Sequence, residues 1–162
     1  ERELPVWQAI LIGLRGIGRL LEGDAHAAFR SRVAALVRPA LADLGWEAVP
    51  GETDLRAKLR GVLVSALAVL ADDADAQQRC REVVRQTAPD PELFATATNV
   101  IAAVGTAADY DHSLELFRTV DNPQEQLRHL FALAPRKLLL GQHRHHWHQS
   151  AHQHVHPAAR RP

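Results

Sequence analysis

The sequence between Leu4 and Ala134 repeats one unit, an amphipathic helix followed by a short turn and a second amphipathic helix. Apolar residues recur every three or four positions, the spacing of the buried face of a helix. No segment alternates apolar and polar residues for long enough to indicate a strand. Because such helices can bury their apolar faces only against one another, the pattern predicts an all-α fold. Helix pairs in series favour a HEAT-like solenoid of antiparallel helix pairs, with a compact orthogonal bundle as the alternative.

Turn and capping signals divide this segment into about seven helices. The first runs from about Leu4 to Leu21, and the second begins with Asp24 as its cap and ends at Gly45. Pro39 inside the second helix predicts a kink, because proline removes a backbone donor. The third helix, from Thr53 or Asp54, is the most apolar and is expected at the centre. The other four helices are signalled by an Asp-rich turn at 72–75, Asp90-Pro91, a group of apolar residues at 110–117, and the cap, proline and glutamate of 122–125.

The composition changes abruptly after Ala134. Residues 1–125 contain all 19 carboxylates and 13 of the 19 Lys and Arg residues, whereas residues 126–162 contain six basic residues and no acid. Seven of the ten histidines lie between His143 and His156. We therefore predict two parts, a helical-repeat domain over 1–134 and an irregular, disordered His- and Arg-rich tail over 135–162. This tail is either natural or the product of an out-of-frame or artificial end.

The composition also bounds the setting of the chain. Cys80 is the only cysteine, so no intrachain disulfide is possible and a reducing, cytoplasmic location is favoured. No leader peptide and no apolar run of about 20 residues is visible, so no membrane partner is expected. The chain contains no Met, which suggests a fragment of a longer protein.

Sequence motifs of catalysis are missing. There is no His-Glu-x-x-His, Gly-x-Ser-x-Gly or P-loop pattern. The glycines at 13, 16 and 18 imitate a nucleotide-binding fingerprint, but they lie inside a helical pattern with no strand before it, so they more plausibly admit a neighbouring helix. Cys80 falls on the apolar face of a predicted helix, so we expect it to be a core residue rather than a nucleophile. The chain is therefore not expected to be an enzyme on its own or to hold a cofactor.

Two sets of residues are candidates for binding. Arg56 and Arg60, one helical turn apart, could recognise a substrate carboxylate, but ion pairs with Glu52 or Asp72 are the favoured alternative. His145, His148 and His152 in the tail could bind metal adventitiously, whereas a dedicated site would need a fixed ligand set. A nucleic-acid partner is not expected, because the basic tail has a single aromatic residue for base stacking.

Several motifs in order resemble a known family. The strongest is the Leu-Gly-Trp turn at 44–46 followed by the Leu-Arg pair that opens the third helix. The others are Asp90-Pro91, Ala103-Val104-Gly105, Tyr110-Asp111 and the segments 122–128 and 132–134. Together they resemble the helical, endoplasmic-reticulum-aminopeptidase-like C-terminal domain of aminopeptidase N-type zinc metallopeptidases. The resemblance covers roughly residues 4–134 and has a bacterial character. Where the family continues with further helix pairs, this chain enters its tail, as a truncated domain would.

The resemblance implies a non-catalytic role. In that family the zinc ligands and the general base lie in a separate upstream domain, and the helical domain shapes the chamber that admits peptides and contacts the substrate. Peptide substrate and the upstream catalytic domain are therefore the implied partners, and zinc would belong to that domain. The alternatives are a free-standing helical-repeat module that binds a protein partner and, less favoured, a His-rich metal-binding protein.

Overall fold

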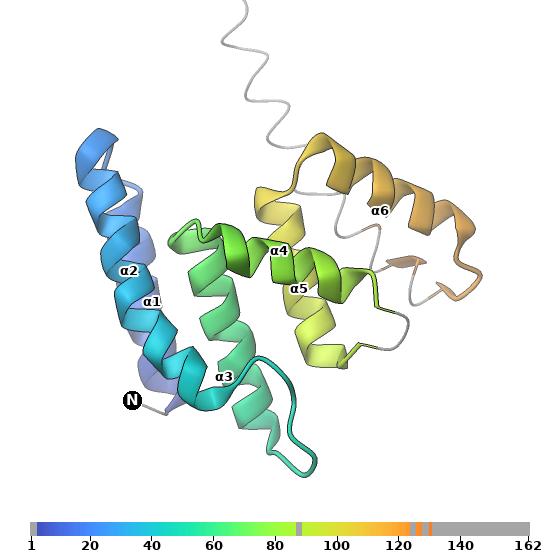
Figure 1. Cartoon of the computed structure of the whole chain (residues 1–162), viewed down its shortest axis with the longest axis horizontal. Helices are drawn as coiled ribbons and strands as arrows, with labels where there is room; N and C mark the ends of the chain where they lie inside the picture. Colours follow the sequence, from blue (N-terminus) through green and yellow to red (C-terminus); the bar gives the residue numbers. More distant parts are fainter. Residues whose placement is uncertain (1–2, 87–88, 124–125, 128–129, 131–162) are drawn as a thin grey trace, which may run out of the picture.

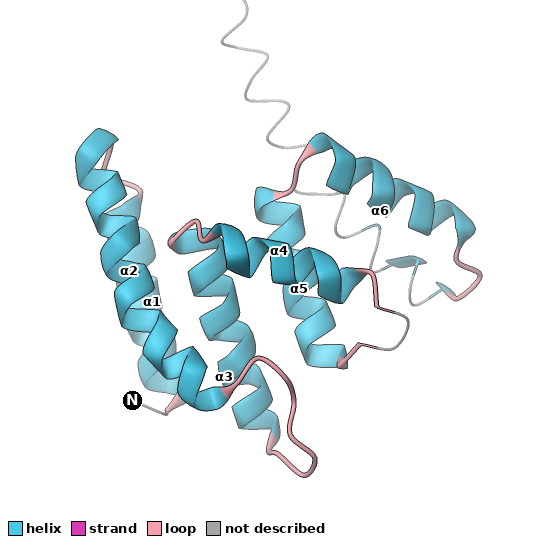
Figure 2. Ribbon diagram, in the orientation of Figure 1, coloured by secondary structure: helices cyan, strands magenta, loops and turns pink. Residues whose placement is uncertain are grey.

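The computed structural model describes residues 3–86, 89–123, 126, 127 and 130. This part of the chain is helical and has no strand, as predicted (Figures 1 and 2). The helices are α1 (Leu4–Gly18), α2 (Gly23–Leu44), α3 (Asp54–Ser65), the π-helical turn η1 (Ala66–Leu70), α4 (Ala74–Val84), α5 (Pro91–Val104) and α6 (Ala107–Thr119). None of the helices in the described part is long and apolar enough to cross a membrane.

The third helix lies at the centre, as its apolar sequence predicts. α3 packs against α1 and α2 on one side and against α5 on the other, and α5 packs in turn against α4. Figure 1 shows α2, α4 and α6 along the near side, with α1 and α5 behind them. The Arg81 side chain of α4 reaches Asp109 of α6, with 3.1 Å between Nε and Oδ1. That these helices form HEAT-like repeats of antiparallel pairs stays a prediction.

The core joins the first five helices and η1 into one apolar cluster. Its members recur at helical spacing on each element and are almost fully removed from water. They include Trp7 and Leu11 of α1, Val33, Val37 and Leu41 of α2, Leu59, Leu63 and Val64 of α3, Leu67 of η1, Cys80 of α4, and Phe94, Ala97 and Val100 of α5. α6 differs, because Asp109 and Ser113 are its buried residues. The continuous buried core therefore runs through α5, and the Arg81–Asp109 ion pair joins α6 to α4.

Most predicted caps are present. Thr53 Oγ1 accepts from the backbone N–H of Arg56, Asp73 caps α4 at Ala76 and Asp90 caps α5 at Leu93. Gly45 ends α2 with φ of 84°, a conformation that glycine adopts without strain. These polar side chains satisfy backbone N–H groups that the first helical turn leaves unpaired.

Some sequence-based expectations were wrong. Asp24 does not cap α2, because that helix begins one residue earlier at Gly23. α1 ends at Gly18 rather than Leu21. Gly13 and Gly16 admit no neighbour, since a Cβ at either position would meet nothing within 4 Å. Gly18 does admit a neighbour, because a Cβ added at this position would lie 2.9 Å from the Phe29 ring.

The chain leaves α3 through an unusual turn. At η1 the helical hydrogen bonds widen to the π pattern, and the Ala71 N–H bonds to the Ala66 carbonyl at 3.0 Å. Asp72 follows with φ of 55°, and Asp73 then opens α4. The turn thereby directs a short acidic segment towards α2.

The end of the domain falls largely outside the described residues. The predicted seventh helix is represented by Pro123, Gln126, Leu127 and Leu130, and the Gln126 N–H bonds to the Asn122 carbonyl at 2.9 Å. Leu127 and Leu130 are exposed, at 52% and 44%. The predicted tail from 135 to 162, including its histidines, lies outside the described part.

Candidate functional site

Arg60 of α3 extends its buried side chain to the turn that follows α2. Its side chain is 2% exposed, and its two terminal nitrogens each lie 2.6 Å from a carboxylate oxygen of Glu52. Its Nε donates to the Gly45 carbonyl at 2.9 Å. The Glu52 hydrogen bonds raise the pKa of Arg60 against the effect of burial, and the same bonds lower the pKa of Glu52. This geometry is that of the predicted alternative, an ion pair that fixes the Leu-Gly-Trp turn.

Arg56 lies beside this pair but faces solvent. Its side chain is 44% exposed, with Nε 3.7 Å from Glu52 Oε2, and one terminal nitrogen donates to the Leu44 carbonyl at 3.3 Å. On the other side of the turn, the Arg79 guanidinium lies 4.9 Å from the centre of the Trp46 ring, a cation–π contact. A substrate contact by Arg56 stays a prediction, whereas Nε and both terminal nitrogens of Arg60 already donate to groups within the chain.

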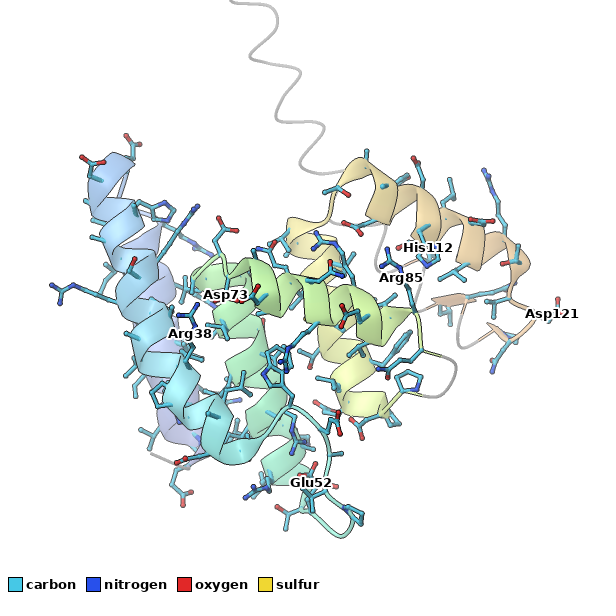
Figure 3. The ribbon with its side chains drawn as sticks, in the orientation of Figure 1. Arg38, Glu52, Asp73, Arg85, His112 and Asp121 are labelled. Carbon is cyan, nitrogen blue, oxygen red and sulfur yellow. The ribbon has the colours of Figure 1, made fainter. Side chains whose placement is uncertain are left out.

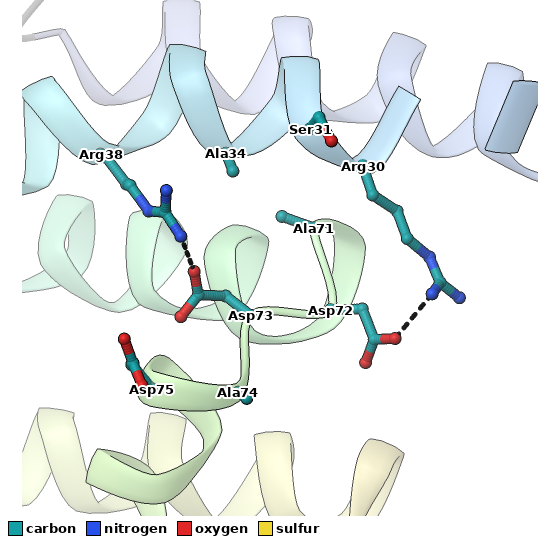
Figure 4. A pocket seen from close by; sticks show the side chains of 9 residues that line it. All are labelled: Arg30, Ser31, Ala34, Arg38, Ala71, Asp72, Asp73, Ala74 and Asp75. Atoms are coloured by element: carbon teal, nitrogen blue, oxygen red, sulfur yellow. Dashed lines mark hydrogen bonds and ion pairs between the residues drawn. The ribbon is translucent and has the colours of Figure 1, made fainter. Parts of the chain in front are cut away.

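A hollow of about 420 Å³ separates the middle of α2 from the start of α4. Figure 4 shows it from close by, and Figure 3 shows Arg38 and Asp73 facing one another across it. We call it the α2–α4 hollow, and it is lined by Arg30, Ser31, Ala34 and Arg38 of α2 and by Ala71, Asp72, Asp73, Ala74 and Asp75. Arg30, Ala34 and Arg38 are spaced by four residues, so α2 presents them along one face.

Two ion pairs cross this hollow. Arg38 bonds to Asp73, and Arg30 lies 2.7 Å from an Asp72 oxygen. Gln77 also donates to Asp72 at 2.9 Å, which holds the turn in its left-handed conformation. Burial raises the pKa of Asp73, but the Ala76 N–H and the Arg38 guanidinium outweigh it, so the net shift is downward. Asp73 is therefore an ionised structural carboxylate.

The hollow still offers polar groups to a ligand. The side chains of Arg30, Arg38 and Asp72 are 42%, 61% and 45% exposed, and each bonded guanidinium keeps further N–H groups. Donors on one wall and carboxylates on the other suit the carbonyl and N–H groups of a polypeptide. The Ser31 hydroxyl, which also lines the hollow, donates to the Ala27 carbonyl at 3.2 Å, and the described residues hold no cluster of three potential metal ligands.

Sequence reasoning missed this hollow. Its two walls lie more than 30 residues apart, and only the turn at η1 brings them together. The available signal was the pair of arginines eight residues apart on α2 and the acidic segment 72–75. Of the other candidates, Cys80 is buried in the core as predicted. His145, His148 and His152 lie outside the described residues.

The comparison with protein families supports the resemblance. A family described as "ERAP1-like C-terminal domain" matches residues 1–138. No curated protein and no solved structure matches the chain. The matched domain is helical and is a non-catalytic part of an aminopeptidase, and any zinc would lie in the upstream domain. Because this match covers most of the chain, the chain belongs to the ERAP1-like C-terminal domain family.

Proposed function

We propose that this chain is the non-catalytic helical segment of a zinc aminopeptidase, that it shapes the chamber through which peptides reach the zinc, and that it contacts the peptide. The observation that carries this proposal is the family match over residues 1–138. Zinc would be held by the upstream catalytic domain, which is the expected partner of this chain. The cytoplasmic location and the bacterial origin also stay predictions.

We place the peptide contact at the α2–α4 hollow. Arg30 and Arg38 are half-exposed, lie two turns apart on one helix, and face carboxylates across a hollow large enough for a few residues of extended chain. Bidentate guanidinium groups bind carbonyl and carboxylate oxygens well. Arg56, in the first turn of α3, is a second candidate, and it already donates to the Leu44 main-chain carbonyl at the end of α2.

Hydrolysis assays test the non-catalytic part of the proposal. The purified chain is expected to leave an aminoacyl fluorogenic substrate intact, with and without added zinc. Turnover that a chelator abolishes would contradict the proposal, because it would require a catalytic zinc site within this chain.

The coding sequence on either side of the chain tests the link to the enzyme. An upstream frame encoding a zinc peptidase domain with a His-Glu-x-x-His motif is expected. A gene that encodes the helical domain without any peptidase would contradict the proposal and favour a free-standing module that binds a protein partner.

A further inference from the structure

A second hollow, of about 350 Å³, lies where the end of α1 meets the first half of α2 and the end of α3. We call it the basic hollow. It is lined by Arg15, Gly18 and Arg19 from α1 and its C-cap, His26 and Arg30 of α2, Ser65 of α3, and Val69 and Leu70 of η1. Its lining residues come from the segments 15–19, 26–30 and 65–70, and the packing of α3 and η1 against α1 and α2 brings the third segment to the first two.

The charge of the basic hollow is of one sign. Four of its eight lining residues are Arg or His, and no acid lines it. Arg15 and Arg19 are one turn apart at the end of α1, and His26 and Arg30 are one turn apart on α2. The like charges of Arg15 and Arg19 repel one another at this spacing along a helix. The arrangement therefore gains stability from a counter-charge inside the hollow.

Little in the described part of the chain supplies that counter-charge. Arg30 pairs with Asp72 through one terminal nitrogen, at the edge shared with the α2–α4 hollow. No ion pair within the described residues joins Arg15, Arg19 or His26 to a carboxylate. His26 stacks on Phe29 with ring centres 6.2 Å apart, which leaves its nitrogens at the ring edge for a ligand.

The floor of the hollow has a defined shape. The absence of a side chain at Gly18 lets α1 approach the Phe29 ring, because a Cβ there would lie 2.9 Å from it. Val69 and Leu70 of η1 add apolar surface to the lining, and Ser65 adds a hydroxyl group. Apolar surface next to cations lowers the local polarity and strengthens attraction to an anion.

We propose that the basic hollow binds an oxyanion, a phosphate or carboxylate group, through Arg15, Arg19 and His26, with Arg30 at its border. Planar guanidinium groups bind both oxyanions in a bidentate manner. The volume exceeds that of a single such group, so the ligand carries the oxyanion at its end. This proposal is independent of the aminopeptidase role, because it stands on the charge and shape of the hollow alone.

Titration of the whole chain with methyl phosphate and, separately, with acetate tests the proposal. The readout is the two-dimensional ¹H–¹⁵N NMR spectrum. Sodium chloride keeps the ionic strength constant throughout the titration. We expect saturable shifts at residues 15–19, at 26 and 30, and at Ser65 for at least one of the two anions. Saturation by methyl phosphate alone, by acetate alone or by both supports the site and identifies its oxyanion class.

Matched variants separate a site from general charge attraction. The double variant Arg15→Gln/Arg19→Gln is expected to weaken binding at least tenfold, whereas Arg32→Gln, which removes an exposed arginine of α2 outside the hollow, leaves it unchanged. Circular dichroism checks that both variants keep the helical fold. Shifts that never saturate, that are spread over all exposed arginines, or that fall equally in the Arg32→Gln variant overturn the proposal, as does the absence of any shift.

Discussion

Arg60 shows how this domain tolerates a buried charge. An isolated guanidinium in the interior would be costly, but here Glu52 accepts two bonds of 2.6 Å and the Gly45 carbonyl accepts a third. The pair fixes the end of α2, the following loop and the first turns of α3 relative to one another. Its removal would leave Glu52, whose side chain is 9% exposed, without its main partner.

Arg60→Ala is therefore expected to lower the free energy of unfolding by about 3–5 kcal/mol, the usual result of breaking a buried pair from one side. Arg56→Ala is the matched control, since it removes a neighbouring arginine that is 44% exposed, and about 1 kcal/mol or less is expected. Urea denaturation followed by circular dichroism measures both. Equal losses in the two variants would show that Arg60 is not the structural residue described here.

Cys80 is expected to be chemically inert in the folded chain. Its side chain is 1% exposed, and burial raises the pKa of its thiol to about 11, so little reactive thiolate exists at neutral pH. A thiol reagent such as DTNB should react with the chain only after urea unfolds it. Rapid stoichiometric labelling of the native chain would contradict the core placement of α4.

At the scale of the element, two glycines inside helices have opposite roles. Gly61 lies where α3 crosses α5, and a Cβ there would come within 2.5 Å of Thr96 Oγ1. Gly13 lies on the open face of α1, with nothing within 4 Å of its Cβ position. The first allows close packing between helices, while the second only weakens its helix.

Gly61→Ala is expected to destabilise the fold by about 1–3 kcal/mol, because the methyl group forces Thr96 or the helix to move. Gly13→Ala should stabilise it by up to about 1 kcal/mol through helix propensity. Thermal unfolding of the two variants gives the comparison. A neutral Gly61→Ala would mean that α3 and α5 approach less closely than described.

The helices themselves were largely predictable from the sequence, because caps and apolar spacing are local signals. Thr53, Asp90 and Gly45 each end or begin a helix where their chemistry predicts. The capping box of Thr106 and Asp109 is a local signal of the same kind, although it is not among the predicted caps. The α2–α4 hollow depends instead on the path of the chain through η1 and Asp72, and periodicity alone carries no information on that path.

At the scale of the whole molecule, three ion pairs with a buried carboxylate connect different parts of the fold. Glu52 and Arg60 join the loop to α3, Arg38 joins α2 to the start of α4, and Arg81 joins α4 to α6. In each case the pKa of the carboxyl group is lowered in the fold. For Asp109, burial raises the pKa, but hydrogen bonds from the Thr106 N–H and hydroxyl and from the Arg81 guanidinium outweigh burial, so the net shift is downward.

Acid is therefore expected to destabilise the domain. A lowered folded-state pKa contributes stability above the unfolded value of about 4, and that contribution is lost as the pH falls towards the folded-state value. The unfolding midpoint in urea should be nearly constant from about pH 7 to pH 5 and should fall below about pH 4. Asp109→Asn should flatten this fall, and Asp111→Asn, at an exposed position, should not. A midpoint that rises on acidification would contradict the sign of these shifts.

The central claim is that this helical segment contacts peptide without hydrolysing it. The most direct measurement is an NMR titration of the ¹⁵N-labelled chain with an unlabelled peptide of about ten residues, in which the peptide's own resonances report cleavage. The account predicts saturable shifts along the α2–α4 hollow, weakened by Arg30→Gln/Arg38→Gln but not by Arg32→Gln, and an intact peptide. Cleaved peptide, or a titration that leaves the resonances of the hollow unchanged, would contradict it.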